Sequence, residues 1–91
     1  MDVVQFFGNI IAKKTGLKRM VCSGMIRLAL RDMKNDPEMY DIRKVKILIK
    51  EFINNRLERA GIENKNELIH LLLLELSKNQ SLLTMSADSK D

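Results

Sequence analysis

Apolar side chains recur at the spacing of an α-helix from the start of the chain, and the whole pattern predicts four helices. The first spans about residues 3–14. Its wide apolar face holds Val3, Phe6, Phe7, Ile10 and Ile11. Asp2 and Gln5 have the spacing of a capping box at its start, and Gly16 is placed to form a left-handed cap at its end.

The second predicted helix spans about residues 18–34 and carries a narrow basic stripe. Its apolar set is Val21, Cys22, Met25, Ile26, Leu28, Ala29 and Met33. Its polar stripe, at steps of four, is Arg19, Ser23, Arg27 and Arg31. The sequence Asn35-Asp36-Pro37 is a stop signal, because the residue before proline is biased away from helix.

Two more helices follow, over about residues 41–60 and 65–77. The core stripe of the third is Ile42, Val45, Ile49, Phe52, Ile53 and Leu57. Gly61 and Ile62 have the spacing of a Schellman end, and Asn64 with Glu67 repeats the capping-box pattern. We expect one helical domain over residues 1–83 and a polar tail over 84–91.

The most apolar part of the chain is the fourth predicted helix, where seven of the nine residues from 68 to 76 are leucine or isoleucine. Such a helix must be buried on every side, so we predict that it is central and that a second copy or another protein covers its remaining face. The predicted interface is Leu68, Ile69, Leu71, Leu72, Leu73, Leu74 and Leu76. A compact monomer built around this helix is the alternative. The expected fold is therefore all-α, a compact four-helix domain assembled as a dimer.

Charge is unevenly distributed along the 91 residues, which carry a net +4. No acidic residue lies between Asp2 and Asp32, whereas the chain after Gly61 is rich in glutamate. The basic positions of the first part are Lys13, Lys14, Lys18, Arg19, Arg27 and Arg31. This asymmetry indicates either a surface for an anionic partner or a solvated face whose counter-charges lie elsewhere in the fold.

Residue types that carry enzymatic chemistry are scarce. Cys22 and His70 are the one cysteine and the one histidine, which excludes an intrachain disulfide and a zinc site built by one chain. We interpret Cys22 as a small buried residue. The four glycines form no phosphate-binding loop. We expect no catalysis, no cofactor, no metal and no small-molecule substrate. The lone cysteine, the lack of a leader pattern and the lack of a long apolar run favour a cytoplasmic protein that does not enter membranes.

Residues 8–26 resemble the DNA-binding helix-turn-helix families, which combine a small residue in the first helix, a glycine in the turn and apolar spacing in the second helix. Here Ala12 and Gly16 hold the first two places. The resemblance implies that the second helix reads a major groove. The residues it implies are Lys18, Arg19, Ser23 and Arg27 toward bases and Arg31 near phosphates. Lys13 and Lys14 extend this basic set. Cys22, Gly24 and Met25 depart from the usual pattern.

Two functional hypotheses follow. The first is a non-catalytic regulatory or adaptor module that binds its own copy, as a homodimer, or another protein through a helical surface. The second is a dimeric helix-turn-helix-like DNA-binding transcriptional regulator that uses the basic segment 13–31. Leucine surplus in the fourth helix favours the first hypothesis, and the basic stripe of the second helix favours the second.

Overall fold

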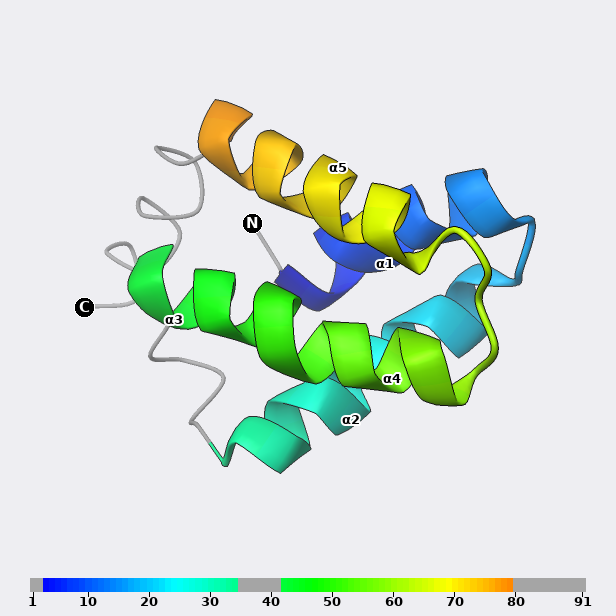
Figure 1. The fold of residues 1–91 in the computed structure, drawn as a ribbon, viewed down its shortest axis with the longest axis horizontal. Coiled ribbons are helices and arrows are strands. Elements are labelled where there is room, and N and C mark those ends of the chain that lie inside the picture. Colours follow the sequence, from blue (N-terminus) through cyan, green and yellow to red (C-terminus); the bar gives the residue numbers. More distant parts are fainter. Residues whose placement is uncertain (1–2, 35–41, 80–91) are drawn as a thin grey trace.

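The computed structural model describes residues 3–34 and 42–79, and all regular structure in these residues is helical. The six elements form four rods (Figure 1): α1 (Val3–Thr15), α2 (Arg19–Met33), the consecutive α3 (Ile42–Ile47), η1 (Leu48–Ile53) and α4 (Asn54–Arg59), and α5 (Lys65–Lys78). The prediction of an all-α chain with four helices is confirmed. The predicted Asp2 cap, the Asn35-Asp36-Pro37 stop and the tail over 84–91 lie outside the described residues.

Helix α1 ends at a left-handed glycine, as predicted. Gly16 has φ +77°, and its N–H donates to the carbonyl of Ala12 at 2.9 Å. The Thr15 hydroxyl donates to the carbonyl of Ile11 at 2.8 Å and accepts the N–H of Leu17 at 3.2 Å. These bonds satisfy backbone groups that the helix end leaves without an intrahelical partner, so the chain turns directly into α2.

Helices α1 and α2 pack at very short range around Gly8. A Cβ added to Gly8 would lie 2.7 Å from the Ser23 hydroxyl oxygen and 3.3 Å from the Ser23 backbone nitrogen. A side chain at position 8 would therefore require the Ser23 hydroxyl to move away and the two helices to separate by a few tenths of an ångström at the Ser23 backbone. The small residue at the closest approach of this helix pair is therefore Gly8, whereas the helix-turn-helix resemblance predicts Ala12 in that role.

The third rod contains a π-helical stretch, η1, that the sequence pattern did not predict. Its buried stripe, Val45, Ile49, Ile53 and Leu57, advances in uniform steps of four, and Leu48 is buried beside it. In a regular α-helix each step of four turns the stripe by about 40°. A π turn, with its i→i+5 bonding, holds more residues per turn and reduces that rotation. The stretch thus keeps the stripe facing the core along the whole rod.

The rod ends in a Schellman motif, as predicted. Gly61 has φ +74°, its N–H donates to the Glu58 carbonyl at 3.0 Å, and the Ile62 N–H donates to the Leu57 carbonyl at 3.1 Å. Ile62 packs against the core. The predicted capping box at the start of α5 is wrong, because the Asn64 side chain makes no capping hydrogen bond.

The prediction that α5 is the central helix is wrong. Leu68, Leu72 and Leu76 are at most 1% exposed and form one stripe that faces the core. On the opposite side His70 is exposed and Leu74 is 46% exposed. Helix α5 lies at the edge of the bundle, against η1, α4 and α1 (Figure 1). A buried stripe at steps of four docks α5 there, and the cover predicted for its outer side by a second copy or another protein stays a prediction.

Candidate interaction surface on helix α2

The apolar side chains that the described residues leave in solvent gather on α2. Six large apolar side chains are more than one-third exposed, and four of them belong to α2 or to the turn before it. These four are Leu17, Met20, Val21 and Leu28. Met20 is 83% exposed, more than any other member of the set. Single exposed apolar side chains are common on protein surfaces, whereas several gathered on one element are informative.

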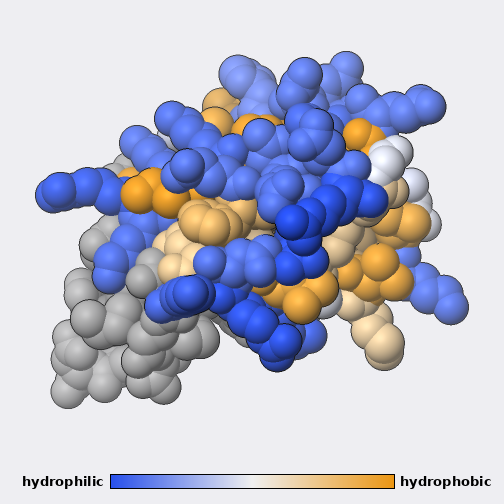
Figure 2. All heavy atoms as spheres, turned by 60° about the horizontal axis from the view of Figure 1, so that its bottom comes forward, coloured by the Kyte–Doolittle hydropathy of each residue, from blue (hydrophilic) through white to orange (hydrophobic). Residues whose placement is uncertain are grey.

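The exposed side of α2 has a regular geometry. Val21, Gly24, Leu28 and Arg31 follow one another at steps of three, four and three, which places them on one stripe along the helix. We call this stripe the α2 seam; Leu17 and Met20 lie at its N-terminal end. The opposite side of α2 carries the buried residues Cys22, Ile26, Ala29 and Leu30. Figure 2 turns the α2 side of the molecule forward, and orange patches lie there among blue ones.

Positive charge accompanies the α2 seam. Lys18, Arg19, Arg27 and Arg31 are all exposed. The acidic residue of α2, Asp32, accepts two hydrogen bonds from the Arg56 guanidinium, at 2.8 and 2.9 Å. This bidentate bond, with weaker attraction from Arg59 and Arg31, lowers the pKa of Asp32 below its ordinary value of 3.8. None of the ion pairs found among the described residues involves Arg27.

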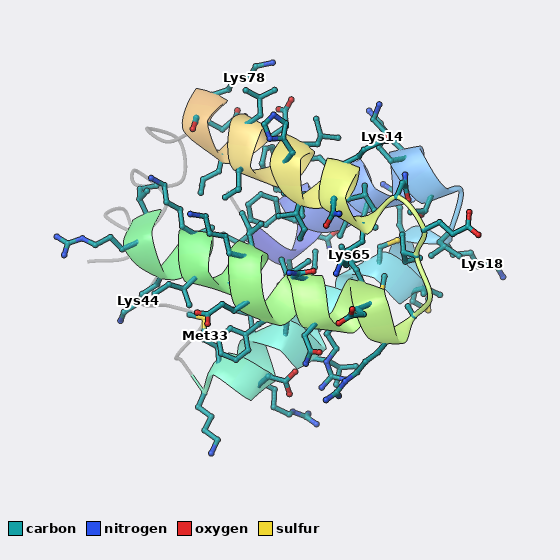
Figure 3. The ribbon with its side chains drawn as sticks, in the orientation of Figure 1. Lys14, Lys18, Met33, Lys44, Lys65 and Lys78 are labelled. Atoms are coloured by element: carbon teal, nitrogen blue, oxygen red, sulfur yellow. The ribbon has the colours of Figure 1, made fainter. Side chains whose placement is uncertain are left out.

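The predicted DNA-binding residues are not brought together on one face. Ser23 is only 6% exposed and lies against Gly8, so the expectation that it points outward is wrong. Lys13 and Lys14 line a groove between α1 and α5. Figure 3 shows Lys14 on the α5 side of the molecule, whereas Lys18 projects away at the far end of the α1–α2 turn. Lys18, Arg19, Arg27 and Arg31 remain exposed on α2.

The predicted interface residues of α5 are divided between core and surface. Leu68, Leu72 and Leu76 are core residues and are closed to any partner. Ile69, Leu71 and Leu73 are half-buried, and Leu74 is exposed. A groove of about 500 Å³ between α1 and α5 is lined by Phe6, Asn9, Ile10, Lys13, Lys14, Leu71 and Glu75. It continues toward His70 and Leu74 as a smaller hollow of about 250 Å³.

Reactive chemistry is sparse in the described part of the chain. Cys22 is fully buried, as predicted, and burial raises the pKa of its thiol while a hydrogen bond with Thr15 lowers it to a smaller extent. Within residues 3–34 and 42–79, no three histidine, cysteine, aspartate or glutamate side chains are grouped to hold a metal ion. No helix in the same ranges is both long and apolar enough to cross a bilayer.

The apolar pattern of the second helix predicts Val21 and Leu28 as core residues, whereas the structure exposes both on the α2 seam. Their spacing with Gly24 was the signal: three and four residues apart, on the side opposite Ile26 and Leu30. A helix with two apolar stripes on opposite sides can bury only one of them against a single core.

The chain matches no family model, no curated protein and no solved structure.

Proposed function

We propose that this chain is a non-catalytic interaction module, regulatory or adaptor in role, that binds a protein through the α2 seam. The observation that carries the proposal is the concentration of exposed apolar side chains on α2 and the turn before it. Full burial of one aliphatic side chain contributes about 1.5–3 kcal/mol. Covering Met20, Val21 and Leu28 together therefore offers a partner several kcal/mol, by the same principle. The partner is a second copy or another protein.

The mixed character of the surface also favours a protein partner. Protein interfaces are enriched in methionine and arginine, with apolar groups at the centre and polar groups at the rim. The α2 seam has Val21 and Leu28 in the centre, and Met20 with Arg27 at its edge. Because α2 is already packed on α1, its backbone needs no ordering at binding, and only the side chains lose freedom.

The proposal is tested with the full 91-residue chain as bait in an extract of its source cells, followed by purification of the recovered protein. Titration calorimetry then compares the wild-type chain with Val21→Glu and Leu28→Glu. We expect each substitution to weaken binding about 30-fold, the effect of losing a central contact worth about 2 kcal/mol. Leu74→Glu is the matched control, because Leu74 is 46% exposed and Val21 48%. Unchanged affinity in both α2 variants, or an equal loss in the control, contradicts the proposal.

A second candidate is nucleic-acid binding, favoured by the four exposed cations of α2. Contacts between lysine or arginine and phosphate make affinity fall steeply with salt. A gel-shift titration of a generic DNA duplex at 50 and 200 mM salt tests it, because four phosphate contacts would weaken binding by about 100-fold over that range. Binding that disappears at the higher salt and in Arg27→Ala/Arg31→Ala supports this candidate. No shift at the lower salt removes it.

A further inference from the structure

Gly24 lies in the middle of α2, and neither its backbone conformation nor the packing around it requires a glycine. Its φ is not in the left-handed range, unlike those of Gly16 and Gly61. A Cβ added to it would meet nothing within 4 Å, whereas one added to Gly8 would collide with Ser23. A glycine inside a helix is less favourable than alanine by about 0.5–1 kcal/mol. The residue that the fold would accept here is therefore alanine or larger.

The position of Gly24 on the α2 seam supplies an external reason. It lies between Val21 and Leu28, so it makes a notch in the middle of the exposed apolar stripe. Glycine is used where another backbone must approach closely. Building on the proposed function, we infer that the α2 seam receives an amphipathic helix of another protein, with aliphatic residues on the seam, its backbone closest to Gly24, and acidic residues beside Arg27 and Arg31.

The spacing of the α2 seam specifies a helical partner. Steps of three, four and three are the spacing by which two helices interlock side chains along a left-handed seam. Such helices lie about 8–10 Å apart, and small residues shorten that distance. Helix α2 has 15 residues, so it presents about 22 Å of length at 1.5 Å per residue. A partner helix of about four turns matches it.

The charges beside the α2 seam specify an acidic partner and oppose a second copy. A two-fold pair centred on Gly24 places Arg31 of each copy beside Leu17 and Lys18 of the other, and a parallel in-register pair places Arg31, a residue of the α2 seam, against Arg31. Both arrangements bring like charges together, because Asp32 is already held by Arg56. Aspartate or glutamate on the partner neutralises the same arginines and steers the encounter. Nucleic acid satisfies the arginines but leaves Val21 and Leu28 facing a charged backbone.

The probes are two synthetic helical peptides of about 22 residues, enough for six turns. Both carry leucine at the seam-facing positions; one has glutamate and the other lysine at the flanking positions. Fluorescence anisotropy with the full chain measures both affinities. We expect the glutamate peptide to bind at least about tenfold more tightly, because several opposite charges meet at one interface. Equal affinities, a preference for the lysine peptide, or no binding to either overturns the inference.

Two variants locate the binding on the α2 seam. Gly24→Met fills the notch, and we expect it to weaken the glutamate peptide at least about tenfold while thermal unfolding shows no loss of stability. Ser77→Met adds the same side chain at an exposed position of α5 and should change neither. Reversal of both arginines, Arg27→Glu with Arg31→Glu, should transfer the preference to the lysine peptide. Unchanged binding in Gly24→Met, or an unchanged preference after the reversal, overturns the inference.

Other occupants give separate outcomes. Light scattering that finds a dimer of the wild-type chain, dissolved by Gly24→Met, assigns the α2 seam to a second copy and overturns the inference. Displacement of the glutamate peptide by a DNA duplex also overturns it. A purified natural partner that depends on Val21 and Leu28 but not on Gly24 or Arg27 leaves the proposed function standing while the inference fails.

Discussion

Helices α5 and α2 reverse the roles that their compositions indicate. Helix α5 has leucine or isoleucine at seven of nine consecutive positions, yet its stripe Leu68, Leu72 and Leu76 is sealed in the core. Helix α2 mixes apolar residues with three arginines, and it exposes Met20, Val21 and Leu28. The difference lies in what packs on each helix. One side of α2 packs against α1 and η1, and no described element covers the other side. Apolar content therefore does not tell which face of a helix remains open.

The largest expected effect on the free energy of unfolding separates the buried and the exposed side of α5. Leu72 is fully buried and Leu74 is 46% exposed. Leu72→Ala should reduce the free energy of unfolding by about 2–5 kcal/mol, through lost burial and the cavity that remains. Leu74→Ala should change it by less than about 1 kcal/mol, as surface substitutions do. Urea denaturation measures both. Similar losses at the two positions would mean that α5 is covered on both sides.

An intermediate effect is expected from the two helical glycines. Gly8→Ala forces α1 away from Ser23, and overpacking of this kind lowers the free energy of unfolding by about 1–3 kcal/mol. Gly24→Ala meets no neighbour and should raise it by up to about 1 kcal/mol. Thermal denaturation of the two variants gives the comparison. A loss of stability in Gly24→Ala would show that glycine is needed there for the fold itself.

The smallest expected effect is a pH dependence of the free energy of unfolding that arises from Asp32 on α2. Because Arg56 lowers the pKa of Asp32, the folded chain binds this proton less tightly than the unfolded chain does. The stabilisation is complete above the ordinary pKa of 3.8 and is lost as pH falls through the lowered value. Asp32→Asn should therefore flatten the unfolding profile below about pH 5. Arg56→Gln should flatten it equally, and a profile that stays steep in both variants would locate the effect elsewhere.

Local signals in the sequence predicted most of the fold. Gly16 and Gly61 marked two helix ends, because left-handed backbone is open to glycine at little cost. The π-helical stretch η1 left no such signal. It arises from the steps of four in Val45, Ile49 and Ile53, which become visible only when the buried face of the rod is known.

The site was harder to predict than the fold. The spacing of Arg19, Ser23, Arg27 and Arg31 predicts one basic face, but each step of four turns the stripe by about 40°. Ser23 therefore reaches the α1 side while Arg27 and Arg31 reach solvent. Helix α2 has two apolar stripes, and the one that is buried is the one that packs against α1 and η1. That packing is settled only when the chain folds. No local pattern contains that choice.

The π turn also bears on how this chain can change in length. A regular helix seldom tolerates an insertion or a deletion, because one residue more or fewer rotates all following side chains by about 100° around the helix axis. Residues 48–53 already hold a surplus within a widened loop of backbone. Removing a single amino acid there would tighten the loop to ordinary α geometry and leave Arg56 opposite Asp32. The third rod thus contains one site where its length is adjustable.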